Sequence, residues 1–371
     1  MNVILETAHG ALQCPAFLPD GTRGVVRALD ATDVANCGVE AMMVNALHLS
    51  SHPGTTVVKQ MGGIHSFMGW DKPVMSDSGG YQVFSLIAEN PKSGSISKKG
   101  FVYRLGNGGK KQTLTPEKCI QKQFHVGADV MFCLDHCTHP NAGVEEQKLS
   151  VKHTIAWAKQ CRDEFDRRQD RNETKLFGVV QGGMDFDLRQ QCVEQLVEIG
   201  FDGYGFGGWP ISDDGALVEA VAWVAELLPK DLPKHALGIG KPENVVRAFH
   251  LGYDTFDCTI PTRDARHKRL CIFNDAPDRV NYDSDFYRYV YIDDERYARD
   301  AEPVDPTCDC LCCKHYSRSY LHHLFDIRDT LAFRLATIHN LRFYVRMMAQ
   351  LSAISCEALQ KDMAEKRPLG G

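Results

Sequence analysis

The 371-residue sequence lacks a run of 18 apolar residues, and its first residues lack the basic start and long apolar stretch of a signal peptide. These absences argue against a membrane protein and predict a soluble protein of the cytoplasm. An excess of positive charge is missing too, because 48 acidic residues outnumber 42 basic ones and leave a net charge of -6. Any contact with nucleic-acid phosphates must therefore be local.

Glycine-rich nucleotide loops are also absent. No Gly-x-Gly-x-x-Gly sequence follows the first predicted strand, and no Gly-x4-Gly-Lys-Ser/Thr loop occurs anywhere in the chain. These absences argue against dinucleotide binding and against ATP hydrolysis. Tryptophan is scarce, with four residues, which disfavours a glycoside hydrolase because such enzymes commonly bind carbohydrate on tryptophan platforms.

Short apolar runs that end in Gly, Asp, Asn or Gln recur between residues 14 and 263, and helix-like stretches separate them. Eight such runs are predicted to be strands: 15–18, 41–47, 73–75, 128–134, 176–180, 203–206, 235–239 and 255–260. Eight alternating units over about 250 residues predict an α/β fold, the (β/α)8 TIM barrel. A doubly wound open sheet is the alternative, disfavoured by the missing glycine loops.

The sequence divides into two predicted regions. We expect residues 1–263 to form the barrel core with the active site, and residues 264–371 to form a C-terminal zinc-binding and helical region packed on the barrel. Within the second region, 264–307 is polar and loop-rich, whereas 316–359 has a helical pattern.

Polar and glycine residues end several of the predicted strands, at the mouth where a TIM barrel has its active site. The carboxylates among them are Asp77, Asp135 and Asp257, and the amide is Gln181. One carboxylate can attack a sugar carbon while a second handles the proton of the leaving group. A third can accept both donors of the guanine N1 and N2 edge, and an amide or backbone N–H can serve guanine O6.

A simpler explanation exists for each of these residues. An aspartate at the end of a strand is more often the N-cap of the next helix, which applies to Asp77 and Asp135. Paired glycines at such turns usually serve backbone geometry. Only their joint recurrence favours a site.

Fourteen cysteines divide into two groups. Ten are scattered through apolar or helical segments and are expected to be reduced core thiols. The other four fall within six residues: Cys308, Cys310, Cys312 and Cys313. The Cys-x-Cys-x2-Cys spacing suits three corners of a tetrahedral structural zinc site, and four histidines compete for the fourth corner: His315, His322, His323 and His339.

Four basic residues lie among the seven from Arg263 to Arg269, directly after the last predicted strand. A solvated charge run is the ordinary explanation. Here the run leaves the predicted mouth, where a polyanionic substrate would need phosphate contacts.

Four long motifs together resemble the tRNA-guanine transglycosylase family over nearly the whole chain. They are SDSGGYQV at 76–83, FGVVQGG at 177–183, FDCTIPTR at 256–263, and the cysteine cluster followed by YSRSYLHHL at 316–324 and TIHNL at 337–341. The resemblance implies an enzyme that replaces guanine at the wobble position of G-U-N anticodons by a 7-deazaguanine. It also implies a cytoplasmic homodimer that needs no ATP.

The resemblance assigns roles residue by residue. Asp257 is the nucleophile on ribose C1′, and Asp77 is the acid and base for the exchanged bases. The incoming base is bound by a larger set: Ser78, Gly79, Gly80, Tyr81, Asp135, Gln181, Gly208 and Leu237. The tRNA anticodon loop is contacted by Gly238, Lys241, Asn244, Thr262, Arg263 and Arg266. One structural Zn²⁺ is bound by Cys308, Cys310, Cys313 and His339, with Cys312 outside the motif.

The sequence departs from the family near the substituent of the incoming base. After Gly207-Gly208 it reads WPISD at 209–213, where bacterial members have other residues, and at 45–48 it reads NALH in place of the usual Asn-Thr-Tyr-His. The base is therefore left open between preQ1, preQ0 and queuine. Because Pro210 has no N–H for a nearby acid and Asp213 is short, we expect weaker selectivity for preQ1 than in those relatives.

Three other functions share part of this pattern. A related enzyme acting on DNA would keep the barrel and the aspartates, but the intact segment from Thr262 to Arg266 disfavours it. A glycoside hydrolase acting on carbohydrate is possible from the carboxylates alone, but the scarcity of tryptophan disfavours it. A non-catalytic partner subunit is expected to lose catalytic aspartates, yet Asp77 and Asp257 are both present.

Overall fold

The computed structural model describes residues 3–106, 109–168, 173–276, 279–282 and 284–365, with side chains as far as residue 354. Eight parallel strands form the central sheet, in the order β3-β13-β12-β11-β10-β9-β5-β4. Their bounds are β3 Ala16–Pro19, β4 Met42–Asn45, β5 Val74–Asp77, β9 Val130–Phe132, β10 Lys175–Val180, β11 Gly203–Phe206, β12 Lys234–Ala236 and β13 Thr255–Cys258. All eight predicted strands are confirmed.

The two outer strands of this sheet meet and close it into a barrel. Asp20, just after β3, forms a parallel bridge with Met43 of β4, and the N–H of Gly21 donates to the Met43 carbonyl at 2.7 Å. The closed α/β barrel is the predicted fold, and the open doubly wound sheet was the wrong alternative.

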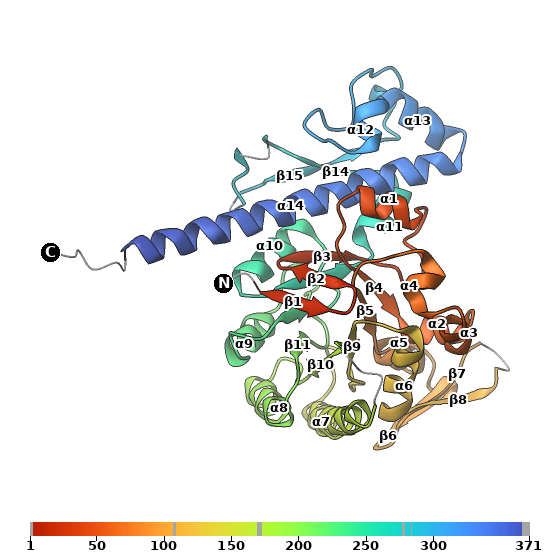
Figure 1. Ribbon diagram of the computed structural model, residues 1–371, viewed down its shortest axis with the longest axis vertical. Helices are drawn as coiled ribbons and strands as arrows, with labels where there is room; N and C mark the ends of the chain where they lie inside the picture. Colours follow the sequence, from red (N-terminus) through yellow and green to blue (C-terminus); the bar gives the residue numbers. More distant parts are fainter. Residues whose placement is uncertain (1–2, 107–108, 169–172, 277–278, 283, 366–371) are drawn as a thin grey trace.

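Helices surround the barrel, as Figure 1 shows. Those between the strands are α1 Ala31–Asn36, α2 Ala46–Ser51, α3 Thr55–Gln60, α4 Gly63–Met68, α5 Gly80–Glu89, α6 Pro116–Val126, α7 Val144–Asp166, α8 Phe186–Ile199, α9 Glu219–Leu227, α10 Pro242–His250 and α11 Ile260–Arg266. Among the described helices, none is long and apolar enough to cross a membrane.

Apolar side chains fill the barrel interior, and a hairpin closes its N-terminal end. The strands contribute Leu18, Met43, Met75, Val130, Phe132, Phe177 and Val179. The hairpin of β1 (Ile4–Thr7) and β2 (Gly10–Gln13) adds buried Leu5 and Leu12 to the same cluster. The opposite end of the barrel, where the strands have their carboxyl ends, is left for the site.

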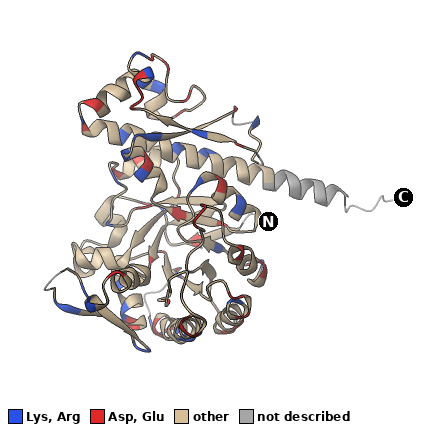
Figure 2. Cartoon of the chain, turned by 180° about the vertical axis from the view of Figure 1, so that it is seen from behind, with Lys and Arg blue, Asp and Glu red and all other residues tan. Residues whose placement is uncertain are grey.

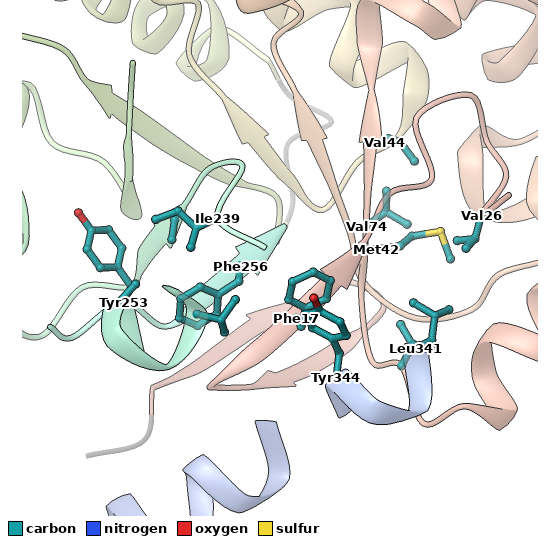
Figure 3. Packing of buried hydrophobic residues seen from close by; sticks show 14 of the residues in the cluster. Phe17, Val26, Met42, Val44, Val74, Ile239, Tyr253, Phe256, Leu341 and Tyr344 are labelled. Carbon is teal, nitrogen blue, oxygen red and sulfur yellow. The ribbon is translucent and has the colours of Figure 1, made fainter. Parts of the chain in front are cut away.

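The C-terminal region packs along one side of the barrel. It contains the hairpin of β14 (Arg269–Phe273) and β15 (Tyr287–Tyr291), and the helices α12 Leu311–His315, α13 Arg318–Asp326 and α14 Thr330–Glu365. In Figure 1, α14 lies between this hairpin and the barrel. Figure 3 shows Tyr344 of α14 against Phe17 of β3, with ring centroids 4.4 Å apart. The division at residue 263 stays a prediction.

Part of the segment read as loop is in fact regular. Residues 269–291 contain the β14–β15 hairpin rather than loop alone, and its tyrosines alternate with other residues along β15. A further small sheet, β6 Gly94–Ser97, β7 Gly100–Arg104 and β8 Lys111–Leu114, was also not foreseen. Short 3-10 helices occur at Pro91–Ser93 and Glu295–Tyr297.

Candidate active site and metal centre

A cavity of about 430 Å³ opens at the carboxyl ends of the barrel strands. Eight of the predicted site residues line it: Asp77, Ser78, Tyr81, Asp135, Gly208, Leu237, Gly238 and Asp257. Gln181 reaches the same group through a hydrogen bond to Asp135. Gly79 and Gly80 do not line the cavity, and instead begin α5 beneath Ser78. The barrel thus brings the three aspartates to one place.

Asp257 ends β13 and is held through a single carboxylate oxygen. Its Oδ1 lies 3.1 Å from Nε2 of buried His235 and accepts the N–H of Gly238 at 3.0 Å. Among the described residues, Oδ2 has no hydrogen-bond partner. The side chain is 20% exposed and faces the cavity, so one oxygen is fixed while the other is available to a substrate.

Asp77 ends β5 and accepts two side-chain amides at Oδ2. Asn45 donates at 2.7 Å and Gln82 at 3.3 Å. Burial raises the pKa of Asp77 to about 6, the charge of Asp257 adds to this, and the hydrogen bond from Gln82 opposes it. The cap of α5 is Gly79, without a side-chain hydrogen bond, so the N-cap explanation for Asp77 is wrong.

Asp135 lies just beyond β9 and is buried, with 8% exposure. The Gln181 amide donates to its Oδ2 at 2.6 Å. Burial raises the pKa of Asp135 to about 7, against the effect of the Gln181 hydrogen bond and with a contribution from the charge of Asp77. The next helix, α7, is capped by Gly143, so Asp135 is not an N-cap either.

The glycine pair after β11 allows backbone to approach the site closely. A Cβ on Gly207 would lie 2.6 Å from Nε2 of Gln181, which real structures do not tolerate. Gly208 has φ of +95°, a conformation that other residues adopt only with strain. Both glycines are therefore required by the geometry around Gln181.

The residues predicted to contact tRNA differ in exposure. Gly238, Lys241 and Arg263 are exposed, and Arg266 is half-buried with its guanidinium donating to the Thr262 carbonyl. Asn244 and Thr262 are buried, and their side chains donate to the carbonyls of Gly215 and Thr259. Their contact with tRNA stays a prediction, and their visible role is to hold loops at the mouth. Figure 2 shows both signs of charge mixed on the face it displays.

Three residues of the site were given no role from the sequence, although Asn45 belongs to the segment 45–48 that was noted as a departure from the family. Asn45 and His235 contact the two catalytic candidates, and Arg189 is 1% exposed beneath the glycine loops. Asn45 ends β4, so its position at the mouth was a usable signal. His235 begins an apolar run and Arg189 lies in a helix, where sequence gives no such signal.

The metal centre groups four buried side chains. Ligand atoms of Cys308, Cys310, Cys313 and His339 all lie within 4.8 Å of one another. His339 Nδ1 is 3.2 Å from Sγ of Cys313, while its Nε2 lies 2.8 Å from the Cys271 carbonyl. A hydrogen bond to that carbonyl leaves Nδ1 free to bind a metal, as ligating histidines usually require.

Spacing left four histidines as candidates for the fourth position of the cluster, and the structure places His339 there. His315, His322 and His323 are outside the cluster, and Cys312 is buried apart from it, as predicted. The remaining described cysteines are free thiols, all buried except half-buried Cys258, in agreement with the expected reduced core. A three-cysteine, one-histidine set is a donor set that suits a closed structural site.

Known proteins resemble this chain over most of its length. The family described as queuine tRNA-ribosyltransferase matches residues 3–367. A queuine tRNA-ribosyltransferase of Psychrobacter sp. (strain PRwf-1) is 39% identical over 92% of this chain and 85% of its own length. One of Aliivibrio salmonicida is 39% identical over 98% and 91%, and one of Pasteurella multocida 38% identical over 98% and 89%. The chain belongs to the queuine tRNA-ribosyltransferase family.

Proposed function

We propose that the protein is a tRNA-guanine transglycosylase, which exchanges guanine at wobble position 34 of G-U-N tRNAs for a 7-deazaguanine. The observation that carries this proposal is the convergence of Asp77, Asp135 and Asp257 on one cavity. Each of the three has a different environment, which suits three separate tasks. Family membership supports the reaction class.

Asp257 is suited to act as the nucleophile. Its Oδ1 is fixed by His235 and Gly238, so Oδ2 can form a bond to ribose C1′ while the bond from C1′ to guanine N9 breaks. The tRNA is then held as an ester of Asp257. In the second half of the exchange, N9 of the incoming base attacks C1′ and the Asp257 carboxylate leaves.

Asp77 is suited to donate and accept the proton of the exchanged bases. A pKa raised to about 6 keeps a share of Asp77 protonated near neutral pH, so it can give its proton to departing guanine. The Asp77 carboxylate then removes the N9 proton of the incoming base. Protons balance over the exchange, and no co-reactant is needed.

Asp135 and Gln181 suit recognition of the purine. The ionised Asp135 carboxylate would accept the N1 and N2 protons of the base together. Gln181 uses one amide proton on Asp135 and can give the other to O6, beside the N–H of Gly208. Tyr81 and Leu237 line the cavity from different segments and would enclose the ring between them.

The basic residues near the mouth suit local phosphate contacts. Exposed Lys241 and Arg263 and half-buried Arg266 lie within a few residues of cavity residues Gly238 and Thr259 along the chain, so an anticodon loop entering the mouth would meet them. We also propose a homodimer acting in the cytoplasm, as the resemblance implies. Gel filtration with light scattering tests the dimer.

Labelled-guanine exchange tests the reaction. Purified protein should incorporate radiolabelled guanine into tRNA with a G-U-N anticodon and not into duplex DNA. Incorporation into DNA alone would favour the DNA-modifying alternative. No incorporation into either substrate would favour a non-catalytic subunit and contradict the proposal.

We propose that the bound metal is one structural Zn²⁺ per chain. Cys310→Ser should lower the zinc content and destabilise the C-terminal region, because structural zinc contributes folding energy. Cys312→Ser is the matched control, since Cys312 is also buried but lies outside the cluster. Metal analysis of tag-free protein should give one zinc for the wild type and Cys312→Ser. Absence of zinc from the wild type would contradict the proposal.

A further inference from the structure

His235 is a buried imidazole that extends along β13 toward the proposed nucleophile. It lies on β12, in register with Thr255 of the neighbouring strand β13. Its Nδ1 lies 2.8 Å from Oγ1 of Thr255, and its Nε2 lies 3.1 Å from Oδ1 of Asp257. Because side chains two residues apart on a strand point to the same side of the sheet, one imidazole can contact both. Thr255, His235 and Asp257 therefore form a chain of hydrogen bonds that ends at the nucleophile.

The two partners of His235 determine which nitrogen carries the proton. An ionised carboxylate only accepts hydrogen bonds, so Nε2 donates its proton to Asp257. In a neutral imidazole Nδ1 is then an acceptor, and the Thr255 hydroxyl donates to it. The imidazole is fully buried, with the centroid of the Phe132 ring 5.1 Å from its own. In such surroundings a nitrogen without a partner is costly, which favours keeping both hydrogen bonds.

Formation of the ester changes the charge on the oxygen that His235 contacts. The free Asp257 carboxylate shares its negative charge between both oxygens. In the ester, Oδ2 is bonded to ribose C1′ and Oδ1 becomes a neutral carbonyl oxygen. Hydrogen bonds to an ionised acceptor are roughly twice as strong as those to a neutral one. Because the N–H groups of His235 and Gly238 both meet Oδ1, they stabilise the free carboxylate more than the ester.

We propose that His235, oriented by Thr255, is a positioning residue that shifts the covalent step toward release of the ribose. This inference rests on the proposed exchange reaction. When N9 of the incoming base attacks C1′, the bond from C1′ to Oδ2 breaks and its electron pair returns to the Asp257 carboxylate, while the N9 proton passes to Asp77. The negative charge that returns to Oδ1 meets two N–H groups that are already in place. Asp257 is thereby a good leaving group as well as a nucleophile.

Separate measurement of the two half-reactions tests this role. Excess protein is mixed with end-labelled G-U-N tRNA, and formation of the adduct that survives denaturation is followed on gels. Excess guanine is then added, and loss of the adduct is followed. His235→Leu removes the donor, so the ratio of the formation rate to the breakdown rate should rise about tenfold. His235→Gln places an amide N–H close to the position of Nε2 and should keep the ratio near wild type.

Thr255→Val tests the hydrogen-bond chain without removing a donor to Asp257. Loss of the hydroxyl leaves Nδ1 of His235 without its partner, so the imidazole is less firmly oriented. The ratio of the two rates should rise in the same direction as in His235→Leu, but by less. Thr255→Ser keeps a hydroxyl and should behave as the wild type. This pair of variants decides the question if His235→Leu does not fold.

His65→Leu is the matched control for loss of a buried imidazole. Nε2 of His65 also lies 3.1 Å from a carboxylate oxygen, that of Asp129 at the N-terminal end of the barrel. This variant should lower the unfolding temperature and leave the ratio unchanged, because a structural loss changes the amount of active protein and not the balance between carboxylate and ester.

Failure of the reaction and failure of this role give different results. A wild type that forms no adduct and exchanges no guanine would contradict the exchange reaction itself. With an active wild type, an equal ratio in His235→Leu and wild type, or in Thr255→Val and Thr255→Ser, would overturn the role of His235. A rise of the same size in His65→Leu would also overturn it.

Discussion

Two buried aspartates flank the same strand, β9, and they differ in almost every other respect. Asp129 precedes the strand at the N-terminal end of the barrel, where it contacts His9 Nδ1 at 2.7 Å and His65 Nε2 at 3.1 Å and accepts the Val74 N–H at 2.8 Å. Asp135 follows the strand at the mouth and accepts one side-chain amide, that of Gln181. Both oxygens of the Asp129 carboxylate have hydrogen-bond partners, whereas the Asp135 carboxylate has a single side-chain donor.

The pKa values of the two groups move in opposite directions. Burial alone would raise the pKa of Asp129, but the hydrogen bonds from His65, His9 and the Val74 N–H outweigh it and lower the pKa. Burial raises the pKa of Asp135 to about 7. A buried carboxylate with several donors joins elements of the fold, whereas one with few donors remains able to bind a ligand.

The largest effect is expected at the mouth, from Asp257→Ala. Guanine exchange should fall by at least about 10⁴-fold because the covalent step loses its nucleophile. tRNA binding, measured by fluorescence anisotropy, should stay largely intact, since the phosphate contacts are elsewhere. Wild-type protein with tRNA and a 7-deazaguanine should give an adduct that survives denaturation. Exchange by Asp257→Ala near the wild-type rate would contradict the mechanism.

Asp129→Asn should damage the fold rather than the chemistry. The substitution leaves two imidazoles and a backbone donor with a poorer acceptor in a buried place, at a cost of about 2 to 4 kcal/mol in the free energy of unfolding. Urea unfolding measures this cost. The kcat/KM per folded molecule should remain near wild type. A stable Asp129→Asn protein with a large loss of kcat/KM would break the comparison.

Asp135→Asn is the matched substitution at the other end of β9, with the opposite expected result. The kcat/KM for guanine should fall about 100-fold, because an amide cannot accept both the N1 and N2 protons. Stability at pH 8 should rise by on the order of 1 to 3 kcal/mol, because ionised Asp135 is disfavoured by burial. Reduced stability together with normal exchange would reverse the assignment.

The contrast between the two ends of β9 also explains which residues could be predicted from the sequence. The eight strands were located correctly because each combines an apolar run with a polar or glycine end, and such ends lie at the mouth in any barrel. Asp77, Asp135 and Asp257 were therefore identifiable. Asp129 was not, because its partners His9 and His65 lie 120 and 64 residues away. Neither partner belongs to a local motif.

Other omissions have the same physical cause. His339 could not be chosen over three nearby histidines by spacing. It lies on α14 and Cys313 on α12, with α13 between them in the chain, and only the packing of α12 against α14 brings the two together. Trp209 was read through the backbone of Pro210, whereas its indole contacts Tyr81 and the Thr138 carbonyl across the mouth. Contacts between distant segments require the folded barrel.

The smallest expected effect is the pH dependence of kcat/KM and of stability in the wild type. It distinguishes the role of Asp135 from that of Asp129 without a mutation. Asp135 must be ionised to accept the base, and its pKa is raised to about 7, so kcat/KM for guanine should fall as pH decreases from 8 to 5. Asp77, with a pKa of about 6, titrates in the same range, so the apparent pKa belongs to the coupled pair.

Stability should respond differently over the same range. Because the pKa of Asp129 is lowered by folding, its contribution is present above its unfolded value of about 3.9 and is lost only as pH falls below that value. The raised pKa of Asp135 makes its ionised form a cost, which is complete above about pH 7 and decreases steadily as pH falls from about 7 toward the unfolded value of about 3.9. Initial exchange rates and thermal unfolding are measured together from pH 8 to pH 5. Activity should fall at least about tenfold while neither aspartate lowers the unfolding temperature. Asp135→Asn should flatten the activity profile near pH 7, and Asp129→Asn should leave its shape unchanged. A profile of the same shape in wild type and Asp135→Asn would mean that ionisation of Asp135 does not control binding of the base.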